Sequence, residues 1–177
     1  PRQTILILVS HNEMPVLPTI RSRCRQLRLD RLSQEETQSV LERQTLDAAE
    51  VKLAARLSPG QPGLGLTLIG PDSVAAVDAM DAALTAMPQL NVGLLDAACA
   101  TAGKSTQAFE AAGQAALRFL HANGLSATDP SDGEVWAKLH SDTLDAMRQA
   151  RELNMELSGA VLHILLHMQR ALRQLVS

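Results

Sequence analysis

The stretch ILILVSHNEMPVLPTIRSRCRQLRL, residues 5–29, combines an apolar run, a loop with two prolines and four closely spaced arginines. The apolar run continues from Thr4 to Ser10, and its β-branched residues and leucines have the length and composition of a strand buried on both faces. Leu27 and Leu29 then alternate with polar residues, which indicates a second, short strand. A lone strand is not stable, so we expect its sheet partners outside this sequence. The chain, which begins at Pro1, is therefore expected to be part of a longer protein.

Composition points to helices for the remainder of the chain. Hydrophobic residues make up 46% of the 177 residues, which is typical of a globular protein, and aromatic residues only 2%. Sequences rich in alanine and leucine favour helices packed on helices. So few aromatic residues argue against a base-stacking surface for single-stranded nucleic acid.

The charge is unevenly distributed. The net charge is −3, but residues 1–31 contain six arginines against Glu13 and Asp30, a net of +4 that leaves −7 for the remainder. Such a local positive charge predicts a specific anionic partner rather than general binding to polyanions. The two distant cysteines, Cys24 and Cys99, form neither a metal motif nor a disulfide framework, which fits a cytoplasmic protein. The sequence shows no signal peptide and no apolar run long enough for a membrane span.

Capping and turn signals then predict three short helices. Ser33 and Glu36 have the spacing of a capping box at a helix start. A second helix is predicted over residues 47–57, a turn over the SPGQPG stretch at 58–63, and a third helix that ends at Gly70. The GPDS stretch, residues 70–73, is the best candidate for a domain boundary.

Beyond this boundary the periodicity is helical throughout. Helices are predicted near residues 74–87, 90–102, 105–123, 133–153 and 155–175. Ser105 is predicted to cap the third of them, and Ser131 with Glu134 to form a capping box for the fourth after a loop over 123–130. Asn154 is expected to interrupt the last stretch.

These features together resemble one family. An apolar strand, the stretch LPTIRSRC at 17–24, a short strand and the stretch LAARLSPGQPGLGL at 53–66 are similar to the AAA+ clamp-loader subunits of bacterial DNA polymerase III. The resemblance is specific in residues 5–66 and only architectural after them. It implies a mainly α chain made of a remnant of the AAA+ α/β core over 1–31, a three-helix lid over 32–72 and a helical collar over 73–177.

The resemblance also assigns roles to single residues. Ser22, Arg23 and Cys24 resemble the family's SRC motif, which implies that Arg23 acts in trans as an arginine finger on ATP held by a neighbouring subunit. Ser10 and His11 lie where the family has its sensor-1 residue. Leu64 lies where the family's ATPases carry a sensor-2 arginine, and no arginine or lysine follows until Lys104. This favours a subunit that does not hydrolyse ATP, with an ATPase (γ/τ) subunit or an unrelated helical scaffold as alternatives.

The implied partners are the ATPase subunits γ/τ and the δ subunit, contacted through the collar, and the sliding clamp and primed DNA, contacted through the whole complex. No cofactor, metal or small-molecule substrate is implied for this chain. We expect the final helix to offer an apolar surface to these partners, with candidates Val161, Leu165, Met168 and Leu172, some of which must serve the internal core.

Several other residues have a simpler interpretation. Arg21 is expected to be solvated or salt-bridged, with a role at the same interface as Arg23 as the alternative, and Arg25 and Arg28 are expected on a solvated face. Cys24 is expected to be a small buried residue, with a reactive thiol as the alternative. His163 and His167 have the i, i+4 spacing of a metal pair, but the sequence suggests no third ligand, so partly buried or interfacial histidines are expected.

Overall fold

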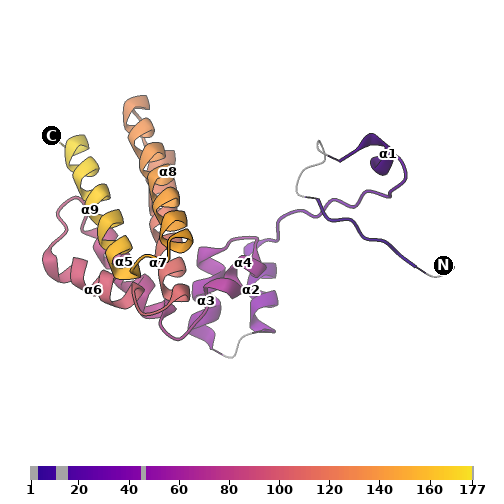
Figure 1. Cartoon of the computed structure of the whole chain (residues 1–177), viewed down its shortest axis with the longest axis horizontal. Coiled ribbons are helices and arrows are strands. Elements are labelled where there is room, and N and C mark those ends of the chain that lie inside the picture. The colour runs from indigo at the N-terminus through magenta and orange to yellow at the C-terminus, as the bar shows by residue number, and fades with distance from the viewer. Residues whose placement is uncertain (1–3, 11–15, 45–46, 177) are drawn as a thin grey trace. The chain divides into compact units, whose positions relative to one another are not determined.

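A computed structural model describes residues 4–10, 16–44 and 47–176, which are mainly helical and contain no strand (Figure 1). The helices are α1 (Pro18–Arg21), α2 (Gln34–Glu42), α3 (Ala48–Leu57), α4 (Pro62–Leu68), α5 (Ser73–Thr85), α6 (Val92–Ala102), α7 (Thr106–Ser126), α8 (Pro130–Glu152) and α9 (Leu157–Val176). Contacts divide the chain into two compact units, Pro1–Arg31 and Leu32–Ser177.

In the first unit, the predicted strands do not form. Residues 4–10 run as an extended segment whose apolar side chains face solvent, with Ile5 87% and Val9 85% exposed. Leu27 and Leu29 are also exposed. The prediction of a strand buried on both faces is therefore wrong for the described chain. The physical reason is that a strand needs the backbone of a neighbouring strand, and none of the described residues supplies one.

In the second unit, helices α2, α3 and α4 pack together around a small core. The predicted capping box is confirmed, because Ser33 Oγ accepts from the Glu36 amide and the Glu36 carboxylate accepts from the Ser33 amide. Thr37 is completely buried, and its Oγ1 accepts the Gly60 amide at 3.1 Å, which ties the turn after α3 to α2. This core consists of Leu41, Val51, Ala54 and Ala55, with Ile69 against it.

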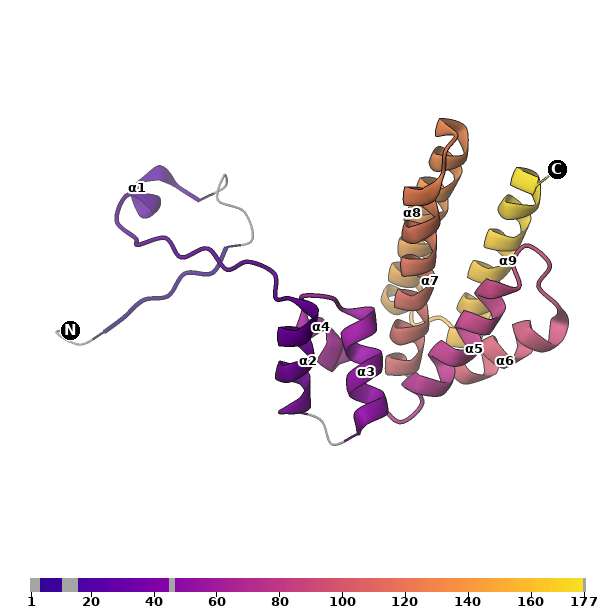
Figure 2. The same ribbon diagram turned by 180° about the vertical axis from the view of Figure 1, so that it is seen from behind.

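Helices α5 to α9 surround a larger core with α7 at its centre. Figures 1 and 2 show the long helices α7 and α8 side by side, and α7 also packs against α5 and α6. Leu53 and Leu57 of α3 and Leu68 of α4 belong to this same core. Apolar burial of this kind supplies most of the stability of a helical protein, because amphipathic faces leave water together.

The helix ends confirm some capping predictions and correct others. Ser105 caps α7 by accepting the Ala108 amide at 3.1 Å, as predicted. Helix α8, however, is capped by Asp129, which accepts a hydrogen bond from the Ser131 amide at 2.8 Å. The prediction of a capping box formed by Ser131 and Glu134 is therefore wrong. The predicted loop over 123–130 is also too long, because α7 continues to Ser126.

The predicted interruption at Asn154 is confirmed. Asn154 has φ 46°, a left-handed conformation that asparagine tolerates. The Met155 amide donates to the Ala150 carbonyl at 2.9 Å across this residue, which is the backbone pattern of a Schellman helix end. Glu156 then accepts the amides of Ser158 and Gly159 at the start of α9.

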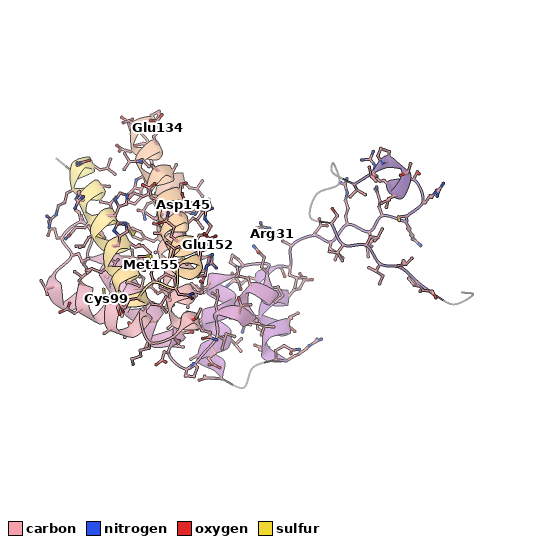
Figure 3. The ribbon with its side chains drawn as sticks, viewed as in Figure 1. Arg31, Cys99, Glu134, Asp145, Glu152 and Met155 are labelled. Atoms are coloured by element: carbon pink, nitrogen blue, oxygen red, sulfur yellow. The ribbon has the colours of Figure 1, made fainter. Side chains whose placement is uncertain are left out.

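The final helix presents to solvent a face other than the one predicted. Val161, Leu165, Met168 and Leu172 are all buried in the chain's own core. Leu162 and Leu166, one position later along the helix, are 39% and 41% exposed. The side chains of Glu134, Asp145 and Glu152, labelled in Figure 3, are exposed along α8. Among the described helices, none combines the length and apolar character that crossing a membrane requires.

Candidate functional site

The segment that carries the predicted site is a one-turn helix with a defined end. Pro18 occupies the first position of α1, where its missing amide hydrogen costs nothing. The Leu17 carbonyl accepts the amides of Ile20 and Arg21 at 2.9 and 3.1 Å. Ser22 ends the turn, since its amide donates to the Pro18 carbonyl at 2.9 Å and its Oγ to the Thr19 carbonyl at 3.3 Å. The proline and the serine therefore fix the backbone immediately before Arg23.

Arg23 follows this turn with its side chain exposed. Its amide donates to the Ile20 carbonyl at 3.0 Å, so its backbone is held by the same turn. Within the described part of the chain, its guanidinium has neither an ion pair nor a hydrogen-bond partner. A free guanidinium is a permanent cation whose planar donors match carboxylate and phosphate oxygens. The arrangement can therefore receive an anion from outside the chain.

The neighbouring residues are exposed as well. Arg21 and Arg25 face solvent, as predicted. Cys24 is also exposed, so the prediction of a small buried residue is wrong. The reason is the same as for the strands, because no other described residue of the first unit covers Cys24. Ser10 lies in the exposed extended segment, and His11 lies outside the described residues.

Leu64 lies in the first turn of α4, directly after Pro62 and Gly63. Its side chain is partly buried and packs against the large core. It therefore makes an apolar contact and offers no charge to a phosphate.

The structure adds one polar contact that sequence reasoning missed. His167 Nε2 lies 2.9 Å from Oδ2 of Asp142 on α8, and this hydrogen bond is the main reason that the pKa of Asp142 is lowered. The rings of His163 and His167 are parallel with centroids 6.3 Å apart. In the residues that the structure describes, no group of three His, Cys, Asp or Glu could hold a metal ion. No sequence pattern joins Asp142 to His167, because the contact arises only when α8 and α9 pack.

Comparisons of the chain with family models, with curated proteins and with solved structures found no match.

Proposed function

We propose that this chain is the C-terminal part of a clamp-loader subunit similar to the δ′ subunit of bacterial DNA polymerase III, and that it presents Arg23 to ATP held by a neighbouring γ/τ subunit. The observation that carries the proposal is the exposed guanidinium of Arg23, which has no partner among the described residues. Arg23 lies within the Ser22-Arg23-Cys24 triplet, directly after a one-turn helix with a defined end. In this proposal, residues 1–31 belong to an AAA+ core, 32–72 to its lid and 73–177 to a collar. The two cysteines form no disulfide, which suits the cytoplasm.

Arginine-finger chemistry explains why this residue type is needed. Hydrolysis of ATP in a loose transition state spreads negative charge over the oxygens of the transferred phosphoryl group. A guanidinium from a neighbouring subunit stabilises that charge with two parallel hydrogen bonds and need not lose a proton to do so. The arginine then acts only when the subunits are assembled, which couples hydrolysis to assembly.

In this proposal, the chain itself does not hydrolyse ATP. Leu64 contributes an apolar contact at the position where the family's ATPases have a sensor-2 arginine. The chain would therefore contribute no charge to a nucleotide through its own lid.

The outer face of α9 supports a collar role. Leu162 and Leu166 are exposed one turn apart, and the exposed Arg170 follows at the same spacing. This stripe of two leucines and one arginine could pack against an amphipathic helix that carries a carboxylate, in a γ/τ or δ subunit. The sliding clamp and primed DNA would then be engaged by the assembled complex.

The test uses complexes reconstituted with the full-length protein. Arg23→Ala should leave assembly intact and slow ATP turnover, whereas Arg21→Ala and Arg25→Ala, which remove equally exposed neighbours, should leave turnover nearly unchanged. Arg23→Lys should recover only part of the rate, since a point charge cannot reproduce the planar fork. Equal turnover by wild-type and Arg23→Ala complexes at equal assembly would refute the proposed role.

A further inference from the structure

Two of the described histidines face each other across different helices. His121 of α7 and His140 of α8 have ring centroids 6.4 Å apart, with their planes inclined by 56°. Neither imidazole has a hydrogen-bond or ion-pair partner within the described residues. No described group therefore competes with an external ligand for the ring nitrogens.

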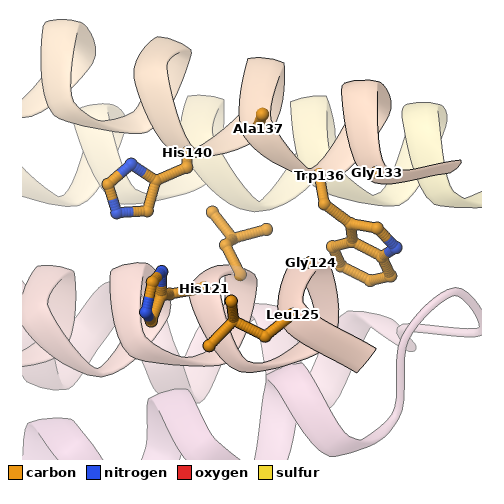
Figure 4. Close-up of a pocket in the computed structure, with 8 residues that line it drawn as sticks. His121, Gly124, Leu125, Gly133, Trp136, Ala137 and His140 are labelled. Carbon is orange, nitrogen blue, oxygen red and sulfur yellow. The ribbon is translucent and has the colours of Figure 1, made fainter. Parts of the chain in front are cut away.

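The two rings line a hollow between α7 and α8 with a volume of about 280 Å³. Figure 4 shows the two imidazoles at one end of this hollow and Trp136 at the other, with Leu125 between. A Cβ atom at Gly133 would meet nothing within 4 Å, so there is open space beside this residue. Among the described residues, the lining contains no carboxylate, lysine or arginine, so the imidazoles are the only titratable groups found there.

We propose that His121 and His140 together bind a first-row divalent transition-metal ion, such as Zn²⁺ or Cu²⁺, and so link α7 to α8. Neutral imidazole is the commonest protein ligand for these metals, at about 2.0–2.1 Å from nitrogen to Zn²⁺. Two imidazoles on one tetrahedral ion have centroids about 5 Å apart, so the rings must approach by only about 1 Å. His121 is exposed, and a small rotation of its side chain supplies that movement.

The site has two protein ligands and an otherwise open coordination sphere. No third His, Cys, Asp or Glu converges on the two imidazoles among the described residues. Water completes the coordination sphere, as it does in metal sites that keep open positions.

The second pair, His163 and His167, is a poorer site and serves as a matched control. His167 Nε2 is already engaged by Asp142, and the positive Lys138 Nζ lies 3.7 Å from the same carboxylate. Metal binding there would have to compete with that contact close to a cation. Both rings also belong to α9, so a metal on them would link no two helices.

The test uses Trp136, the only tryptophan of the chain, which lines the same hollow. Titration with Cu²⁺ should quench its fluorescence saturably in the wild-type protein and in His163→Ala. His121→Ala and His140→Ala should each weaken this quenching at least about tenfold, because loss of even an outer-shell partner of a metal costs about 10–100-fold in affinity. Zn²⁺ binds such ligands more weakly than Cu²⁺, so only a large excess of Zn²⁺ should reverse the quenching. Zn²⁺ alone should raise the melting temperature of the wild type but not of His121→Ala.

Because His121 is exposed, His121→Ala is expected to fold, and its melting temperature without metal checks this. Superimposable quenching curves for wild type, His121→Ala and His140→Ala would overturn the proposal. An equal loss of quenching in His163→Ala would overturn it too, since binding would then depend on α9.

Discussion

Arg23 has no partner among the described residues, whereas several other arginines do. Arg56 Nη1 lies 2.7 Å from Asp81 Oδ2, and Arg148 Nη2 lies 2.9 Å from Asp145 Oδ1. Such surface pairs contribute only about 0–1 kcal/mol, yet they occupy the donors of the guanidinium. The donors of Arg23 stay free in the described chain, so its substitution should change stability by less than about 0.5 kcal/mol. Any effect of Arg23→Ala on a complex can then be attributed to its partners.

Glu110 on α7 provides a test of stability against pH. Burial is the main cause that raises its pKa, while Arg151, whose Nη1 lies 3.3 Å from Oε1, opposes the shift. Oε1 accepts no well-aligned hydrogen bond. A carboxyl with a raised folded pKa contributes stability below its unfolded pKa of about 4.3, and that contribution is lost as pH rises through the folded pKa. Glu110→Gln should therefore match the wild type near pH 3 and be equally or more stable at pH 7.

Urea unfolding near pH 3 and at pH 7 measures the difference in stability between Glu110→Gln and the wild type. Glu152→Gln is the matched control, because Glu152 is exposed on α8, and its free energy of unfolding should stay within about 0.5 kcal/mol of the wild type at both pH values. A Glu110→Gln protein that is less stable than the wild type at pH 7 but not at pH 3 would show that the ion pair with Arg151 outweighs burial.

At the scale of one element, the two glycines of α4 should respond oppositely to alanine. A Cβ atom at Gly65 would lie 2.6 Å from Ser58 Oγ and 3.2 Å from the Ala54 Cβ. Ser58 is buried and its Oγ donates to the Ala54 carbonyl at 2.6 Å, so it has no free space into which to move. Gly65→Ala should therefore destabilise the protein by about 1–3 kcal/mol, which is typical of an overpacked core.

Gly63 is the control in the same helix, because a Cβ atom there would meet nothing within 4 Å. Gly63→Ala should stabilise the protein by about 0.4–1 kcal/mol through the lower entropy of the unfolded chain. Thermal or urea unfolding of both variants measures whether each substitution raises or lowers the free energy of unfolding. Equal effects of the two substitutions would show that α4 does not approach α3 as closely as described.

The elements also show where sequence reasoning succeeds and where it stops. Local signals predicted the capping box at Ser33 and the interruption at Asn154, because a cap and a left-handed residue act within one helical turn. The prediction of a loop over 123–130 was wrong because Gly124 lies in a close contact between α7 and α8. A Cβ atom added to Gly124 would lie 3.3 Å from the Cβ atom of Trp136. Asp129 with Pro130 at the first helical position replaced the box predicted at Ser131.

For the candidate site, the Ser22-Arg23-Cys24 triplet could be found from the sequence, because it is contiguous. The burial of Cys24 could not be predicted, since burial depends on elements packed over it. The pairs formed by Asp142 with His167 and by His121 with His140 come from different helices. Only the packing of α8 against its neighbours brings them together.

For the whole molecule, limited proteolysis should separate the two units. Arg21, Arg23, Arg25 and Arg31 are exposed in the first unit, outside any long helix. Trypsin should therefore cut among residues 21–31 and leave a resistant product that begins near Leu32. Mass spectrometry of the early products identifies the positions of the first cuts. First cuts inside α7 would contradict the division at Arg31.

A protease of broad specificity would test the predicted boundary at 70–73. Leu57 and Leu68 share the large core with α5 and α7, so the second unit should resist cleavage at this bend while the shared core is intact. Early cleavage there would show that the proposed lid and collar open independently.

The central claim is that Arg23 stabilises the transition state of ATP hydrolysis in a neighbouring subunit, and affinity for a transition-state analogue tests it most directly. An interaction that acts in the transition state should change the affinity of the assembled complex for ADP with aluminium fluoride far more than its affinity for a non-hydrolysable ATP analogue. Arginine fingers in other systems contribute about 10³–10⁵ in rate. We therefore expect Arg23→Ala to weaken the analogue complex strongly at one nucleotide site, with near wild-type affinity for the ATP analogue and normal assembly. Unchanged affinity for ADP with aluminium fluoride in the Arg23→Ala complex would contradict the account.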